Sequence, residues 1–118
     1  MTTLYGIKNC DTVKKARRWL EEQGIDYHFH DFREAGLDEP LASAWLSELG
    51  WETVVNRRST TWKGLSSDAR ENMDTTSALA AILEAPTLIK RPVLDTGNER
   101  LVGFSAERYT HIFERHTR

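Results

Sequence analysis

Apolar residues recur with the spacing of strands and helices in the first third of the chain. Thr3 to Ile7 reads as a short strand, and Ile25 to Phe32 alternates loosely as a second strand. Between them, Thr12 to Gln23 has apolar residues at the i, i+3 and i+7 positions of a helix, and Gly24 is well placed to end it. Two strands joined by a helix that packs back on them should be parallel, with a right-handed crossover.

The middle of the chain has helical periodicity. A helix is predicted from Asp38 through Leu49, and a further short turn from Trp51 to Val55. Thr76 to Glu84 predicts an alanine-rich helix. The predicted inward-facing residues are Leu41, Trp45 and Leu49 in the first helix, and Leu79, Ile82 and Leu83 in the last.

The last third has the pattern of a hairpin followed by a helix. Pro92–Leu94 and Arg100–Phe104 flank the turn residues Asp95–Asn98, which predicts two antiparallel strands. Ser105 is a candidate N-cap for a helix from Ala106 to His116. The order β-α-β then β-β-α predicts an α/β, thioredoxin-like, four-stranded mixed sheet. We expect one domain, residues 1–118, with a helical insertion at 33–87 between strands two and three.

Composition changes this picture little. The 118 residues are 39% hydrophobic and 29% charged, with a net charge of −2, so nothing draws the chain electrostatically to nucleic acid or membrane. No apolar run approaches the roughly 18 residues of a membrane span. One cysteine, no export signal at the N-terminus and no internal disulfide predict a cytoplasmic monomer.

The candidate chemistry centres on that cysteine, Cys10. It lies on the turn between the first strand and the first helix, where free backbone N–H groups and the helix dipole favour a thiolate. A buried, inert cysteine is the alternative. Because the chain holds no second cysteine, an external thiol must resolve any adduct, which makes glutathione the expected co-substrate.

Residues that flank Cys10 are candidates for substrate binding. Lys8 either stabilises the thiolate or points to solvent, and Asn9 either offers its amide to the ligand or serves only the turn. Asp11 caps or begins the helix, and Thr12 can donate to an anion at the helix end.

Three segments carry a resemblance to a known family. The opening Leu4–Thr12, the block Asn56–Trp62 and the segment Ile89–Pro92 resemble the arsenate reductase family, most closely its YffB-like branch. Members of that branch are described as glutathione-dependent thiol reductases. The resemblance covers essentially the whole chain.

The resemblance implies roles for individual residues. Cys10 matches the nucleophile, and Arg91 matches the arginine that precedes a cis proline, here Pro92. Arg57 or Arg58, with Arg58 favoured, matches an anion-binding arginine on the insertion; the alternative is a solvated basic pair. Glutaredoxin is an implied partner if arsenate is the substrate.

Two departures from the family pattern narrow the function. The place of a third anion-binding arginine is occupied by Gly103 or Phe104, which argues against arsenate as substrate. The family includes Spx-type regulators that bind RNA polymerase, many with Cys-x-x-Cys, but here the second position is Val13. An internal disulfide switch is therefore excluded.

The sequence thus predicts an enzyme: a glutathione-dependent monothiol reductase acting on a small anionic or disulfide substrate. The alternatives are a glutaredoxin-coupled arsenate reductase and a non-catalytic regulator that binds RNA polymerase. His28 and His30 share a strand face with Asp31 nearby, but nothing suggests a third or fourth ligand at matching geometry, so no metal is expected. No Walker or dinucleotide glycine pattern is present, so no nucleotide is expected.

Overall fold

The computed structural model describes residues 2–116 and divides the chain into two compact units, each considered by itself. Unit 1 consists of the two terminal segments, Met1–Ala35 and Arg91–Arg118, and unit 2 is Gly36–Lys90. The predicted insertion, residues 33–87, overlaps unit 2 over most of its length. Whether the chain behaves as one domain in solution stays a prediction.

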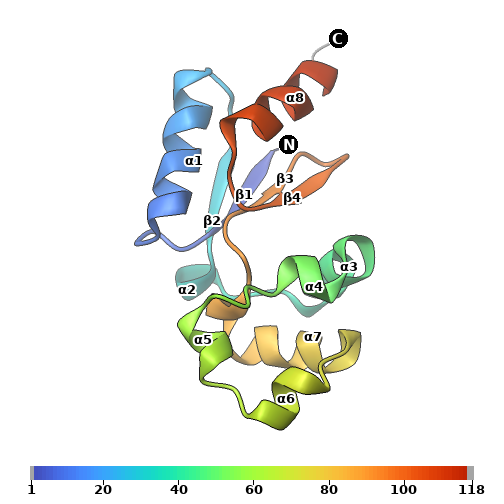
Figure 1. The fold of residues 1–118 in the computed structure, drawn as a ribbon. Helices are drawn as coiled ribbons and strands as arrows, with labels where there is room; N and C mark the ends of the chain where they lie inside the picture. Colours follow the sequence, from blue (N-terminus) through green and yellow to red (C-terminus); the bar gives the residue numbers. More distant parts are fainter. Residues whose placement is uncertain (1, 117–118) are drawn as a thin grey trace. The chain divides into compact units, whose positions relative to one another are not determined.

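The strands of unit 1 form one mixed sheet in the order β2-β1-β3-β4 (Figure 1). Strand β1 pairs in parallel with β2 and antiparallel with β3, and β3 pairs antiparallel with β4. This confirms the predicted four-stranded mixed sheet and the parallel crossover. The strands are β1 Thr3–Gly6, β2 His28–Asp31, β3 Val93–Asp95 and β4 Arg100–Val102.

Unit 1 also contains helices α1 Asp11–Glu22, α2 Phe32–Ala35 and α8 Ala106–His116. Helices α1 and α8 pack on the sheet face that carries Leu4 and Leu94, and the ring of Trp19 meets Tyr109 edge-on with centroids 5.7 Å apart. Burial of this apolar surface fixes α1, and with it the residue at its start, against the sheet. The fully buried members of the cluster are Leu4, Ala16, Leu20, Leu94 and Tyr109.

Unit 2 is helical, with one isolated antiparallel bridge between Val55 and Ile89 in its described residues. Most of its helices begin at a Ser or Asp whose side chain accepts a first-turn N–H, and α3 and α7 pack together. The elements are α3 Glu39–Leu49, α4 Trp51–Val54, α5 Thr60–Lys63, α6 Ser67–Glu71, α7 Thr75–Glu84 and the 3₁₀ turn η1 Pro86–Leu88.

The buried faces of these helices differ from the predicted ones. In α3 the buried residues are Ala42, Trp45 and Leu46, whereas Leu41 and Leu49 are half-buried. Steps of four residues drift around a helix, so a strict i, i+4, i+8 row is not a straight stripe. In α7 the buried residues are Ala78 and Ile82. Small alanines face inward in both helices, which the prediction overlooked.

Two strands are shorter than predicted. The residues after Gly24 close the C-terminus of α1, because the Ile25 N–H donates to the Leu20 carbonyl (3.0 Å), so β2 begins only at His28. Strand β4 stops at Val102 because Gly103 has a φ of 79° and turns its N–H to the Pro92 carbonyl (2.8 Å).

Candidate functional site

Cys10 is half-buried and occupies the N-cap of α1. Its backbone is extended (φ −106°, ψ 123°), and its carbonyl accepts the Lys14 N–H at 2.9 Å, the first bond of the helix. Within residues 2–116, its side chain caps none of the N–H groups of the first turn. The thiol therefore lies at the positive end of a helix whose donors are left for another acceptor.

A tight turn brings the chain from β1 to Cys10. The Cys10 N–H donates to the Ile7 carbonyl at 3.2 Å, so Lys8 and Asn9 are the central residues of the turn. The side chain of Ile7 is buried, whereas Lys8 and Asn9 are exposed. Of the predicted binding residues near the thiol, Asp11 begins the helix as predicted, and Thr12 is exposed beside it.

A buried carboxylate holds this turn from the neighbouring strand. Asp31, 6% exposed at the end of β2, accepts the backbone N–H of Lys8 at 3.1 Å and that of Arg33 at 2.7 Å. Burial by itself would raise the pKa of Asp31, but the N–H groups of Arg33, Lys8 and Glu34 outweigh it and hold the pKa below its ordinary value. Asp31 is therefore an ionised anchor for the Cys10 turn.

The side chain of Lys8 is directed elsewhere than to the thiol. Its ammonium forms an ion pair with Glu34 at 2.5 Å, and that hydrogen bond raises the pKa of Lys8. The sequence leaves two interpretations of Lys8, a stabiliser of the thiolate or a side chain that points to solvent. In the structure, Lys8 is exposed and pairs with Glu34. The pair reinforces the attachment of the turn to the start of α2.

Arg91 and Pro92 lie at the same edge of the sheet as the Cys10 turn. Tyr5 pairs with Val93 in register, so the chain leaving β1 and the chain entering β3 meet at that edge (Figure 1). The Arg91–Pro92 peptide bond is cis, as the resemblance predicts. The buried Nε of Arg91 has no hydrogen-bond partner in the described part of the chain, which leaves a donor for an anionic group.

Backbone contacts fix the segment that follows Arg91. The Pro92 carbonyl accepts the Gly103 N–H at 2.8 Å, and the Gly103 carbonyl accepts the Tyr109 hydroxyl at 3.1 Å. Burial raises the pKa of Tyr109, so this hydroxyl stays protonated and donates. Gly103 thus links Pro92 to Tyr109 through its backbone.

Arg57 and Arg58 belong to unit 2 and are both exposed. The Arg58 N–H donates to the Asn56 side chain at 3.0 Å, and the Arg57 guanidinium lies 5.7 Å from the centroid of the Trp51 ring. They precede α5, whose N-cap Ser59 accepts the Trp62 N–H at 3.1 Å. The choice between the two arginines stays open.

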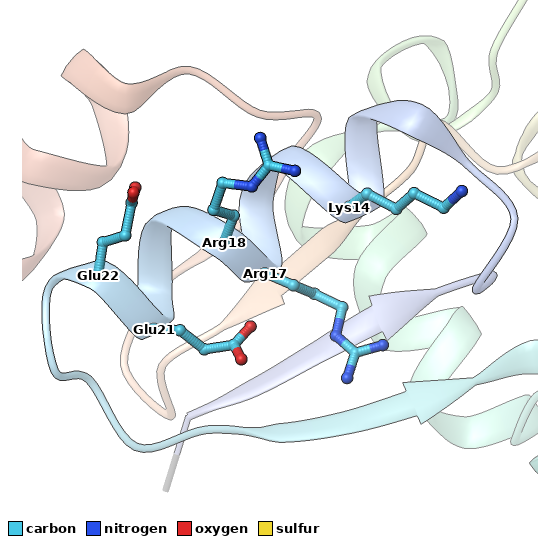
Figure 2. A pocket seen from close by; sticks show the side chains of 5 residues that line it. All are labelled: Lys14, Arg17, Arg18, Glu21 and Glu22. Carbon is cyan, nitrogen blue, oxygen red and sulfur yellow. The ribbon is translucent and has the colours of Figure 1, made fainter.

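The hollow on the exposed side of α1 is lined by charged side chains, of which Arg17 and Glu21 contact Tyr27 (Figure 2). Arg17 points toward β2, donates its Nε–H to the Tyr27 hydroxyl at 3.0 Å and lies 4.2 Å from the Phe29 ring centroid. The Tyr27 hydroxyl in turn donates to Glu21 at 3.2 Å. These contacts attach α1 to the β2 side of the sheet. The lining residues are Lys14, Arg17, Arg18, Glu21 and Glu22.

Residues that the sequence left unassigned complete the site. Asp31 was noted only as a neighbour of two histidines, and Gly6 was read as a strand residue. A Cβ on Gly6 would lie 2.7 Å from a Val13 methyl, so glycine lets α1 approach β1 closely. The sequence feature that could have identified both residues is their position at the ends of predicted strands, where a strand and the next helix meet.

The described residues contain neither a metal-binding cluster nor a membrane-spanning helix. Among them, no group of three or more His, Cys, Asp or Glu side chains is arranged to hold a metal ion. None of the helices in the described part of the chain is long and apolar enough to cross a bilayer.

The chain is similar to several known proteins over nearly its full length. A structure titled YFFB (PA3664) protein has 43% identity and a TM-score of 0.90, covering 94% of this chain and 97% of that one. A structure of an arsenate reductase (ArsC) related protein from Brucella melitensis has 46% identity and a TM-score of 0.78, covering 95% and 93%. The global transcriptional regulator Spx of Streptococcus agalactiae is 28% identical over 109 residues, 91% of this chain and 79% of that protein.

The family model that matches the chain is described as the ArsC family, and it covers residues 5–112. That span includes Cys10, both basic residues of the Arg57–Arg58 pair, and the cis Arg91–Pro92 bond. The sheet, the position of the cysteine and the match agree with one another. The chain belongs to the ArsC family.

Proposed function

We propose that the chain is a glutathione-dependent monothiol reductase in which Cys10 is the nucleophile. The observation that supports this most is the placement of Cys10 at an uncapped helix start, half-buried, on a turn anchored by Asp31. An uncapped start leaves its N–H groups to stabilise a sulfur anion. A single thiol with such an environment favours exchange with an external thiol over an internal disulfide.

The reaction balances with glutathione as the only reductant. The Cys10 thiolate attacks a sulfur of a mixed disulfide between the substrate and glutathione, and the substrate leaves as its thiolate. Cys10 is then disulfide-bonded to glutathione. A second glutathione thiolate attacks the glutathione sulfur of this adduct, which yields glutathione disulfide and regenerates the Cys10 thiolate. In the net reaction, one free glutathione thiolate and the mixed disulfide give the substrate thiolate and glutathione disulfide.

Arg91 supplies positive charge at this site. Its Nε–H is buried without a hydrogen-bond partner among the described residues, so a carboxylate of glutathione or of the substrate can accept from it. Asn9 and Thr12 are assigned to binding the rest of the ligand. Lys8 contributes through its backbone N–H, which Asp31 holds.

Mass spectrometry of the intact protein tests the proposal. After incubation with glutathione disulfide, we expect one glutathione per chain, removed by excess glutathione and absent in Cys10→Ser. Arg91→Ala should form the adduct at least about tenfold more slowly, and Arg91→Lys should recover part of the rate, since a lysine keeps the charge but loses the planar fork. An unmodified wild-type thiol under these conditions would reject the proposal.

Arsenate reduction is the second candidate, because the Brucella melitensis relative is named as arsenate reductase-related. Against arsenate, the resemblance places Gly103 or Phe104, neither of which is an arginine, at the position of the third anion-binding residue. We expect turnover of arsenate with glutathione and glutaredoxin to be weak or absent. Rapid turnover would make arsenate the preferred substrate.

A regulator is the third candidate, because Spx is a relative at 28% identity. The experiment is a pull-down of purified RNA polymerase with the tagged chain. Retention that survives Cys10→Ser would favour a binding role independent of the thiol. We expect no retention.

A further inference from the structure

We propose that Asp31 is a positioning residue for Cys10: its carboxylate sets the place of the thiol by holding the backbone of the turn before it. The proposal rests on the proposed thiol function and gives Asp31, so far only the anchor of the turn, a role in the reactivity of Cys10. Asp31 does not touch the reacting sulfur and acts through Lys8, whose N–H it accepts at 3.1 Å.

Asp31 holds the short turn that connects β1 to Cys10. Asp31 pairs in register with Gly6, the last residue of β1, so its side chain lies beside the point where the chain leaves the sheet. The bonded N–H belongs to the first central residue of the turn, and Cys10 is the fourth residue of that turn. A movement of the Lys8 peptide therefore moves Cys10 relative to the start of α1.

The two oxygens of the carboxylate have separate tasks. One accepts the Arg33 N–H at 2.7 Å, a local bond two residues along the chain that ends β2. The other accepts the Lys8 N–H, 23 residues away in sequence. Only the second bond links the thiol-bearing turn to the sheet, so the two tasks can be separated by substitution.

Two variants remove the long-range bond in different ways. Asp31→Asn has a single acceptor oxygen, and its NH₂ would face one of the two backbone donors. Asp31→Ser keeps a hydroxyl that can still accept the Arg33 N–H locally but is too short to reach Lys8. If the first variant does not fold, the second keeps the proposal open to disproof.

Matched controls separate positioning from charge and from general stability. Glu34→Gln breaks the ion pair with Lys8 while leaving the Lys8 N–H bonded to Asp31. Asp74→Asn weakens the N-cap of α7 in unit 2, a second carboxylate that accepts a backbone N–H. We expect both controls to stay within about twofold of the wild-type rate of Cys10 modification.

The sign of the effect discriminates between mechanisms. Removing a negative charge near the thiol would, by electrostatics alone, favour the thiolate and speed its alkylation. Loss of positioning predicts the opposite: both Asp31 variants should react with iodoacetamide about tenfold more slowly near neutral pH, with the rate profile displaced to higher pH. Hydrogen exchange of the Lys8 amide, followed by NMR, should become faster in both.

The outcomes are distinct. Slower alkylation together with a freed Lys8 amide supports the positioning role. Unchanged or faster alkylation in a folded variant overturns it, whatever happens to the amide. If the wild-type protein forms no adduct with glutathione disulfide, the proposed reductase function fails, whereas the alkylation rates still decide whether Asp31 positions the thiol.

Discussion

Helices α1 and α7 begin in opposite ways. At the start of α7, Asp74 accepts the Ser77 N–H at 2.8 Å and the Ser77 hydroxyl accepts the Asp74 N–H at 2.9 Å, a complete capping box. At the start of α1, Cys10 caps nothing within residues 2–116. Asp38, Ser59 and Ser66 also cap their helices.

The missing cap at the start of α1 lowers the stability of this helix but leaves its N–H groups available to the thiol. A thiol is a poor acceptor for backbone N–H groups, so Cys10 gives up the stabilisation of about 0.5–2 kcal/mol that a Ser or Asp N-cap supplies. The turn that carries it is instead held from outside the helix, by Asp31. The preference for a capping side chain is not met at the start of α1 but is met at the capped helices of unit 2. Such a departure from local preference is expected at a functional position.

The largest effect should come from Cys10→Ser. The serine hydroxyl cannot perform thiol exchange, so adduct formation with glutathione disulfide should be lost completely. The same hydroxyl is a good N-cap, so at acidic pH, where neither side chain is charged, the free energy of unfolding should rise by about 0.5–1 kcal/mol. Urea unfolding and intact mass measure the two quantities. A variant that lost stability would show that α1 is already satisfied at its start.

The second largest effect concerns the approach of α1 to the sheet. Gly6→Ala places a Cβ 2.7 Å from a methyl group of the buried Val13, in the first turn of α1. We expect a loss of about 1–3 kcal/mol in unfolding free energy and slower alkylation of Cys10. Combining it with Val13→Ala should cost less than the sum of the single changes. Strict additivity would mean that the contact is not the cause.

The fold was largely predictable from the sequence because its signals are local. Alternation, helical spacing, the turn at Asp95–Asn98 and the N-cap Ser105, which accepts the Arg108 N–H at 3.3 Å, each lie within a few residues. The position of Cys10 follows from a short segment as well, whereas the cis bond at Pro92 is what the family resemblance implies. Their roles in binding and catalysis stay predictions.

The rest depends on contacts between distant residues. The bond between Asp31 and Lys8 joins residues 23 apart and exists only once β1 and β2 are in register. The clash that forbids a side chain at Gly6 likewise depends on how α1 packs. The ion pair of Lys8 with Glu34 follows from the same register, which is why the sequence left the direction of Lys8 open.

Removing a capping side chain in unit 2 should change the free energy of unfolding but not the reactivity of Cys10. Ser66 accepts the Ala69 N–H at 3.1 Å, so Ser66→Ala should lower the unfolding free energy by about 1 kcal/mol. Because Ser66 belongs to unit 2, the alkylation rate of Cys10 should be unchanged. A change in that rate would break the contrast, since it would mean that a cap far from Cys10 in the sequence also controls the thiol.

The smallest effect is the pH dependence of the capping box at α7. The Ser77 N–H, followed by the Ser77 hydroxyl, holds the pKa of Asp74 below its ordinary value. A carboxylate with a lowered pKa stabilises the folded state fully above its unfolded pKa, about 3.9, and loses that contribution as the pH falls through the folded value.

Asp74→Asn should therefore unfold with a shallower pH dependence below about pH 4, measured by thermal melts at several acidic pH values. Cys10→Ser neither adds nor removes a carboxylate and should leave that acid slope as it is in the wild type. Equal slopes in wild type and Asp74→Asn would show that the capping carboxylate does not differ in proton affinity between the folded and unfolded chain, and the electrostatic half of the contrast between the two helix starts would be lost.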